Sequence, residues 1–418
     1  MKRDRTWRAL APSERVQAGK EAYIGYAVHA TGRLHLDALT TAYDAVCRAY
    51  PQLMARIDTG DDGLVFAASD TRPEVHTCDG DLERPLAGVQ LDQHQMLSAL
   101  NVVHDGEATS ICLLTHHSIA DAQHSLEVLA AVLSCYTDVV GGVPIDVPCR
   151  PFPRSLEDLL AERGIGRGTA DDGWAPQPSM VPGQPAVRGQ NTRGQDTRGQ
   201  DAPARHVVQH RMTAAQTSAL ADIGHREKVT VNGLSAGVLL LVEAEVRDLP
   251  LTELIYRSTV NLRSHLTPPV GPTEGTNVIG AMGFTATDDI ARDAVTIGRA
   301  ISARVRAGLA DGSIQRSLLD LLSRPTPDSK PWDPSTAPAV VSMMNWGRVP
   351  PMRTPNDLRL TNFRSASSMR EMTTMGGYVV NTFGSRIGID LAWPENDSEL
   401  PRRIECLRDR LQRLTLRS

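Results

Sequence analysis

This sequence of 418 residues has few aromatic side chains and no excess of positive charge. Phe, Trp and Tyr together make up 4% of the chain, and the formal net charge is −5. Proteins that bind nucleic acid generally need a basic surface and aromatic rings on which bases can stack. The composition therefore argues against nucleic acid as a partner.

Long apolar runs are also missing. The longest purely apolar stretch near a predicted helix, 238–242, is far shorter than the roughly 20 residues that cross a bilayer. The basic residues between Lys2 and Arg8 are followed by mixed polar residues and not by the apolar core of a signal peptide. We expect a cytoplasmic protein that does not span a membrane.

The sequence has few cysteines, and their spacing does not predict a disulfide. The six cysteines form no CxxC pair. We expect reduced, mostly buried thiols, with neither a disulfide framework nor structural zinc. They are Cys47, Cys78, Cys112, Cys135, Cys149 and Cys406.

The chain is long enough for two domains, and its composition shows where they divide. With 41% hydrophobic and 22% charged residues it is globular in makeup, and domains usually hold roughly 100–200 residues. Large apolar residues become rare over 175–205, where prolines accumulate and a five-residue Arg-Gly-Gln unit repeats over 188–202. Such a segment is typical of a flexible linker. We predict an N-terminal domain over 1–174 and a C-terminal domain over 206–418.

Strands and helices alternate in both predicted domains, which indicates an α/β fold. Helices show apolar residues at three- and four-residue spacing, and strands are short apolar runs bounded by turn residues. No glycine-rich phosphate loop lies between them. The predicted helices are 36–50, 126–136, 213–226, 232–247 and 400–414, and the predicted strands are 53–57, 64–67, 111–114, 254–261 and 339–345.

A pair of histidines follows one buried strand and carries the strongest signal for chemistry. His116 and His117 come directly after the apolar run 111–114, and Asp121 lies four residues further on. Successive side chains of a strand point to opposite faces, so only one of the two imidazoles is expected to reach a substrate. The pattern suggests a general base with a supporting carboxylate.

Simpler interpretations of the same residues remain open. Asp121 opens the following helix and could serve as an N-cap or first-turn acid only. The histidines could be one packed and one solvated side chain, and together with Asp121 and His124 they could imitate a metal site. Metal is disfavoured because ligands on consecutive strand residues diverge.

A second motif, Gly233-Leu234-Ser235-Ala236-Gly237, matches the GxSxG pattern of hydrolase nucleophile elbows. The triad of those hydrolases needs an acid and then a histidine after the serine, and His265 is the only histidine beyond Ser235. We therefore expect these small residues to belong to a closely packed helix instead.

The motifs resemble a known superfamily. His116-His117-x-x-x-Asp121 resembles the HHxxxDG motif of condensation domains and acyltransferases, and the turn 48–53 is similar to the one after their first helix. Segments 260–263, 268–277 and 350–355 further resemble the polyketide-associated, dimycocerosyl-transferase-like acyltransferases. The DFGWG signature of the plant branch is absent.

The resemblance implies two chloramphenicol-acetyltransferase-like domains with a channel between them. His117 would be the general base, with His116 structural and no covalent acyl-enzyme formed. Asp121 would be structural and paired with Arg263. One departure is Ala122, where the family has glycine; we expect it to be harmless in a first helical turn.

The implied reaction is transfer of an acyl group from an acyl-CoA or acyl-carrier-protein thioester to a hydroxyl of a polyketide, lipid or macrocyclic metabolite. No cofactor is implied, and we expect a monomer. Ser342 or Asn345 could donate to the developing oxyanion. Arginines of the C-terminal helix, chiefly Arg402, Arg403 and Arg410, could dock the carrier protein or the phosphates of coenzyme A. The alternatives are an amide-forming condensation enzyme and a catalytically inactive homologue that binds the ligands.

Overall fold

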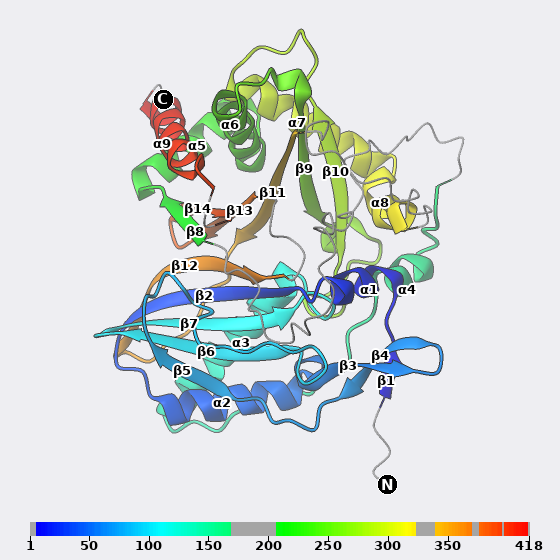
Figure 1. Ribbon diagram of the computed structural model, residues 1–418, viewed down its shortest axis with the longest axis vertical. Helices are drawn as coiled ribbons and strands as arrows, with labels where there is room; N and C mark the ends of the chain where they lie inside the picture. The colour runs from blue at the N-terminus through cyan, green and yellow to red at the C-terminus, as the bar shows by residue number, and fades with distance from the viewer. Residues whose placement is uncertain (1–5, 169–205, 323–338, 370–375, 395–396, 417–418) are drawn as a thin grey trace, which may run out of the picture. The chain divides into compact units, whose positions relative to one another are not determined.

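The computed structural model describes residues 6–168, 206–322, 339–369, 376–394 and 397–416. These residues form two compact units. Unit 1 contains 1–163, 266–278 and 348–370, and unit 2 contains 164–265, 279–347 and 371–418. Both units combine helices with β-sheet, as the predicted α/β class requires (Figure 1).

Unit 1 is built on a five-stranded sheet of order β12-β2-β7-β6-β5, with a smaller sheet of order β1-β4-β3. In the larger sheet all pairs are antiparallel except β5 with β6. The strands are β1 (Thr6–Ala9), β2 (Tyr23–Gly32), β3 (Ala55–Gly60), β4 (Gly63–Ala68), β5 (Val75–Asp79), β6 (Ser98–Asp105), β7 (Ala108–His116) and β12 (Leu358–Ser368). The helices are α1 (Pro12–Gly19), α2 (Leu36–Ala49), η1 (Pro51–Met54), α3 (Ala122–Val140) and α4 (Leu156–Glu162).

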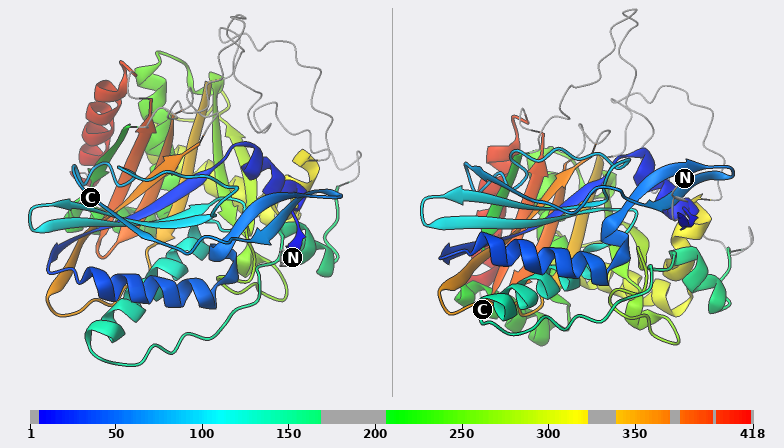
Figure 2. Two further views of the ribbon diagram at one scale, coloured as in Figure 1. Left: turned by 60° about the horizontal axis from the view of Figure 1, so that its bottom comes forward. Right: turned by 90° about the horizontal axis from the view of Figure 1, so that it is seen from below.

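One face of the larger sheet is covered by α2 and α3, which lie side by side (Figure 2). In α2 the buried residues Leu39, Tyr43 and Val46 recur at helical spacing and form one apolar stripe. The hydroxyl of Thr115 on β7 lies 2.8 Å from that of Ser125 on α3, which identifies the helix-facing side of the strand.

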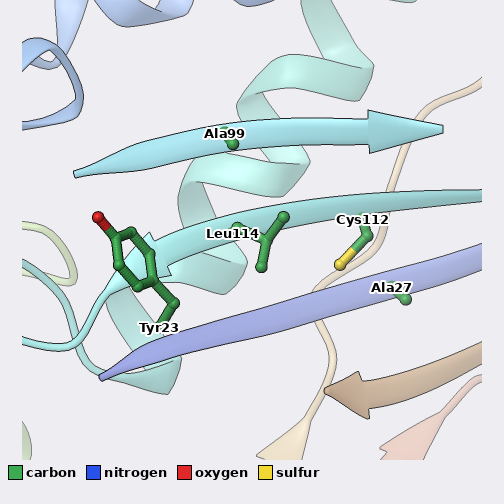
Figure 3. Close-up of a cluster of buried hydrophobic side chains, with 5 residues drawn as sticks. All are labelled: Tyr23, Ala27, Ala99, Cys112 and Leu114. Atoms are coloured by element: carbon green, nitrogen blue, oxygen red, sulfur yellow. The ribbon is translucent and has the colours of Figure 1, made fainter. Parts of the chain in front are cut away.

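The opposite face of β7 carries a separate apolar cluster, shown in Figure 3. Strands alternate their side chains, so Cys112 and Leu114 lie on this face together with His116. The partly buried residues Leu86, Val89 and Leu91 pack against the cluster, whose buried members are Tyr23, Ala27, Ala99, Cys112 and Leu114. His116 therefore lies on the same buried face, directly after Leu114.

Unit 2 is built on a six-stranded sheet of order β10-β9-β11-β13-β14-β8. The strands are β8 (His206–Arg211), β9 (Leu254–Asn261), β10 (Ile279–Thr285), β11 (Ala339–Arg348), β13 (Gly377–Phe383) and β14 (Arg386–Trp393). The helices are α5 (Ala214–Glu227), α6 (Val231–Val246), η3 (Leu251–Glu253), η4 (Arg263–His265), α7 (Ala294–Ala310), α8 (Ser313–Leu322) and α9 (Leu400–Leu416).

Helices α6 and α7 pack so closely that glycine is needed at their crossing. A Cβ built on Gly237 would lie 2.4 Å from the carbonyl oxygen of Ala294, and one on Gly298 would lie 2.6 Å from that of Gly233. Ser235 lies between these glycines, buried inside α6. The GxSxG pattern is therefore a helix-packing feature, as predicted, and not a nucleophile elbow.

The predicted domain boundaries need correction, because the units are not consecutive halves of the chain. Segment 266–278 and strand β12 come from the predicted C-terminal half and belong to unit 1. Strand β12 pairs with β2 along its length, from Leu358 with Gly32 to Ser368 with Tyr23. The predicted linker 175–205 lies outside the described residues.

The helices and strands that were predicted agree with the structure within a few residues, with one local correction. The predicted strand 53–57 begins only at Ala55, because a short 3-10 helix precedes it and starts at Pro51, whose ring fixes its own φ near the helical value. In the described part of the chain, no single helix is long and apolar enough to cross a membrane. All six cysteines are free thiols, and four of them are buried.

Candidate active site

The two histidines of the motif lie in different environments at the end of β7. His116 is the last residue of the strand and is fully buried. Its Nδ1 accepts hydrogen bonds from the hydroxyl of Ser118 at 2.7 Å and from the N–H of Ser118 at 3.2 Å. The ring also meets Tyr23 edge to face, with centroids 4.8 Å apart. These contacts leave His116 a packed side chain.

Burial keeps the His116 ring neutral. Loss of solvation, with a smaller contribution from the charge of His117, lowers the pKa of His116 to about 3. A ring that accepts two hydrogen bonds at Nδ1 must carry its proton at Nε2. His116 therefore does not take up a proton near neutral pH, and its structural role stays a prediction.

His117 follows the strand and is only half-buried. Its N–H donates to the carbonyl of Ala22 at 2.7 Å, so its main chain still follows the edge of β2. Burial lowers the pKa of His117 below its ordinary value, and the carboxylate of Asp121 opposes this shift only in part. Because Nδ1 is buried, Nε2 is the ring nitrogen left to meet a substrate. The result is a neutral imidazole with an available basic nitrogen.

Asp121 is buried and organises the backbone around the motif. It is the N-cap of α3, where Oδ1 accepts from the N–H of His124 at 3.0 Å. Its other oxygen, Oδ2, accepts from the N–H of Val278 at 2.9 Å, and its own N–H donates to the carbonyl of Thr276 at 2.8 Å. Both carboxylate oxygens thus accept hydrogen bonds from backbone N–H groups. Asp121 is an N-cap, as one interpretation predicted, and it also binds the main chain at Val278.

Segment Leu266–Val278, which we call the crossover segment, meets the motif at several points. Besides its bonds to Asp121, it provides the carbonyl of Gly275, which lies 3.0 Å from Nδ1 of His124. A carbonyl can only accept, so Nδ1 carries the proton and Nε2 of His124 accepts from the amide of Gln52 at 2.8 Å. The turn 48–53 and the histidine motif are therefore joined through His124.

This arrangement also bears on the possibility of a metal site. Both ring nitrogens of His124 are occupied by Gln52 and Gly275, and His116 points into the apolar face of the sheet. Within the described ranges, no group of three or more histidine, cysteine or acidic side chains is placed to hold a metal ion.

Ala122 stands where the motif glycine would be, and it is the first residue of α3. The described non-glycine residues with positive φ are Glu21, Lys228 and Asp248, so Ala122 has no need of glycine's conformational freedom. In a helix, alanine is the more favourable of the two residues. The alanine therefore does not strain the backbone that carries His117.

Arg263 and Asn345 both belong to unit 2. Arg263 begins η4, and its backbone N–H donates to Oδ1 of Asn261 at 3.1 Å. The pairing of Arg263 with Asp121 would join the two units and stays a prediction. Asn345 lies on β11, donates to Oδ1 of Asn232 at 2.8 Å, and accepts from the N–H of Gly347 at 2.7 Å. To donate to an oxyanion as predicted, Asn345 would have to use the amide proton that does not bind Asn232.

The arginines predicted to dock a carrier protein already have partners within unit 2. Arg402 donates to the carbonyls of Glu245 and Val246 at the end of α6, at 2.9 and 3.2 Å. Arg403 is buried and donates to Glu243, and Arg410 is paired with Glu245. These contacts attach α9 to α6. They explain the positions of the three arginines without any bound carrier protein.

Sequence reasoning found the histidines and Asp121 but assigned no role to the crossover segment. Residues 268–277 were recognised only as a family resemblance. Gln52 was likewise part of a recognised turn without a function. Their contacts with the motif are long-range, and no local pattern in the sequence predicts them.

Comparison with solved structures defines the class of fold. Polyketide synthase associated protein 5 from Mycobacterium tuberculosis superposes with a TM-score of 0.79 over 99% of both chains, at 26% sequence identity. The first condensation domain of the CDA synthetase superposes with a TM-score of 0.69 over 99% of this chain and 97% of that one, at 13% identity. The chain thus has the fold of condensation domains and related acyltransferases.

Sequence comparison narrows the class to a family. The phthiocerol/phthiodiolone dimycocerosyl transferase of Mycobacterium ulcerans (strain Agy99) is 30% identical over 392 residues, which cover 92% of this chain and 91% of the relative. The enzyme of the same name from Mycobacterium leprae (strain TN) is 30% identical over 85% of each chain. Residues 201–392 match the family described as phthiocerol/phthiodiolone dimycocerosyl transferase C-terminus. The chain belongs to this acyltransferase family.

Proposed function

We propose that this acyltransferase moves an acyl group from a thioester to an alcohol, with His117 as the general base. The observation that carries this proposal is the contrast between neighbouring groups. His116 is buried and already hydrogen-bonded, and both oxygens of Asp121 accept from backbone N–H groups. His117 is the titratable group of the motif that is half-open and has a neutral, basic nitrogen.

In the proposed reaction His117 only accepts a proton and later returns it. Nε2 removes the proton of the hydroxyl while the hydroxyl oxygen attacks the thioester carbonyl carbon, and a tetrahedral oxyanion forms. The intermediate then expels the thiolate, which takes the proton from the imidazolium. The products are an ester and a free thiol, and the imidazole returns to its neutral form. General base catalysis of this kind contributes about 10²–10⁴ in rate, and positioning of the two substrates supplies a further share.

The names of the relatives support a proposal for the substrates. Those proteins are named phthiocerol/phthiodiolone dimycocerosyl transferases. We propose that this chain likewise acylates a hydroxyl of a polyketide, lipid or macrocyclic metabolite. The donor would be an acyl-CoA or the phosphopantetheine thioester of an acyl carrier protein. We also place the reaction in the cytoplasm.

Mass spectrometry of reaction mixtures tests this proposal. Wild-type protein is incubated with a panel of acyl-CoA and carrier-bound acyl donors and with long-chain and polyketide alcohols. Ester and free thiol should appear in equal amounts with the wild type. Replacement of the base in His117→Ala should lower the rate at least about a hundredfold.

A matched variant separates loss of the base from a general effect of removing an imidazole. His225 lies exposed on α5 of unit 2, so His225→Ala makes the same change away from the motif and should leave the rate unchanged. Amines are supplied as competing acceptors. Preferential amide formation, or ester formation that survives in His117→Ala, would contradict the proposal. Absence of product from folded wild type with every donor would favour a ligand-binding protein.

A further inference from the structure

One buried amide lies against the motif, and the proposed function gives it no role. Asn277 of the crossover segment is 4% exposed, and its Nδ2 donates to the main-chain carbonyl of His117 at 2.6 Å. We propose that Asn277 is a positioning residue, which holds the main chain of His117 so that the imidazole keeps its reactive orientation. The inference rests on the proposed role of His117 as the base.

The bond from Asn277 completes the fixation of the His117 backbone. On the other side, the N–H of His117 donates to the carbonyl of Ala22 at 2.7 Å. The peptide groups before and after the Cα of His117 are both hydrogen-bonded, so together they fix the direction of its Cα–Cβ bond. His117 lies just beyond the last paired residue of β7, so the strand ladder alone does not hold its carbonyl. A base must be held within roughly 0.5 Å of its productive position to be effective.

The chemistry of the site fixes which way the amide points. Only the NH₂ group can face a carbonyl oxygen, because the reversed amide would place two acceptors against each other. Oδ1 of Asn277 is then buried and accepts no hydrogen bond from the described residues. A buried acceptor without a donor is unfavourable, and native proteins rarely keep one without a reason. Here the bond to His117 supplies that reason.

Asp121 in turn holds Asn277. The residue before it, Thr276, accepts from the N–H of Asp121, and the residue after it, Val278, donates to Oδ2 of Asp121. Asn277 is therefore fixed by a backbone bond on each side. The two parts of the motif are linked along this route, because the aspartate holds the crossover segment and the crossover segment holds the histidine.

Kinetics of two variants test the inference. Asn277→Asp keeps the shape of the side chain but presents a carboxylate to the His117 carbonyl, and Asn277→Ala removes the group. We expect kcat to fall about ten- to a hundredfold in both, as misplacement of a catalytic group does, while KM for donor and acceptor stays near the wild-type value. Asn101→Asp is the matched control: Asn101 on β6 is also buried, and its amide donates to the carbonyls of Pro85 and Ala87 at 2.8 and 3.0 Å, outside the motif. The control should lower the melting temperature and leave kcat per folded molecule unchanged.

A spectroscopic measurement tests the inference independently of turnover. The ring signals of His117 are identified in histidine-labelled protein by their loss in His117→Ala. In Asn277→Asp they should move and their titration midpoint should change, whereas in Asn101→Asp they should not. Unchanged His117 signals in Asn277→Asp would overturn the inference. If the wild type formed no ester, the proposed function would fail, while this measurement would still decide whether Asn277 positions His117.

Discussion

The carboxylate of Asp121 accepts a 2.9 Å hydrogen bond from the backbone N–H of Val278, 157 positions further along the chain. The same carboxylate caps α3 through the N–H of His124. One buried charge thus joins the start of a helix to a segment from a distant part of the sequence. Its position beside His117 makes Asp121 a structural member of the site.

Asp121→Ala should therefore lower stability far more than it lowers chemistry. Two hydrogen bonds to a charged acceptor are lost, each worth about 1.5–3 kcal/mol, and two buried N–H groups are left without their partner. We expect a lower folded yield and a melting temperature reduced by several degrees. Circular dichroism and the rate per folded molecule check this. Wild-type stability with abolished turnover would show instead that Asp121 takes part directly.

The pH dependence of kcat/KM should report His117. The neutral ring is the active form, and burial lowers the pKa of His117 below the ordinary value, which is about 6.5. Activity should therefore persist below that pH and then fall about tenfold per pH unit on the acid side. An acid limb centred at or above the ordinary histidine pKa would contradict the assignment.

The same measurement needs a stability control on the acid side. His116 has a pKa lowered to about 3 by burial, so between its ordinary pKa and that value the unfolded chain binds a proton that the folded chain does not. Stability consequently falls as the pH falls through this window, by up to about 1.4 kcal/mol per pH unit. Circular dichroism at each pH separates unfolding from titration of His117.

Restoring the motif glycine in Ala122→Gly should bring no gain in turnover. Ala122 is the first residue of α3 and has no positive φ, so the variant only adds freedom to the unfolded chain and to the helix start. We expect a loss of about 0.5–1 kcal/mol in stability and an unchanged rate. A faster Ala122→Gly enzyme would show that alanine displaces His117, contrary to the structure.

Arg403→Ala should destabilise the protein strongly, in contrast to Arg402→Ala. Arg403 lies 3.1 Å from Glu243, which is fully buried and also accepts from the hydroxyl of Tyr378 at 2.5 Å. Glu243 keeps its ion pair with Arg247 at 2.6 Å, but loss of Arg403 leaves the buried charge only partly compensated, at a cost of up to about 3–5 kcal/mol. Arg402 has a half-exposed side chain, so its ion pair should matter by less than about 1 kcal/mol. Thermal melts check both.

The hypothesis that these arginines dock a carrier protein predicts a different result for Arg403→Ala. If Arg403 served mainly to bind a carrier protein, Arg403→Ala would melt like the wild type and lose affinity for the carrier in a salt-dependent manner. Affinity is measured by titration at low and high salt.

Local features of the fold could be read from the sequence because they depend on neighbouring residues. The strand 254–261 was predicted with the bounds that β9 has, and the helix over 36–50 differs from α2 by one residue. Alternation along β7 predicted that the two histidines would face different surroundings. The small residues around Ser235 also pointed correctly to a packed helix, although the contact with α7 itself was not predictable.

Pairings between distant segments were beyond sequence reasoning. Nothing near Leu358 indicates that it pairs with Gly32, and the polar residues 274–277 carry no sign that they meet Asp121 and His117. The predicted division of the chain into two consecutive domains was therefore wrong. A break in composition shows where the chain is polar, but it does not show that a later strand pairs with an earlier one. Asn277 was missed because its role depends on one long-range bond.

The pairing of β12 with β2 also has a consequence for how the protein is made. During synthesis, β2 emerges more than three hundred residues before the strand that covers its edge. Until residue 368 has left the ribosome, β2 remains an open strand edge able to pair with other chains. Any nascent fragment that stops earlier lacks one of the five strands of the sheet that carries the histidines. The five-stranded sheet behind the histidine motif is thus completed only after residue 368 has been translated.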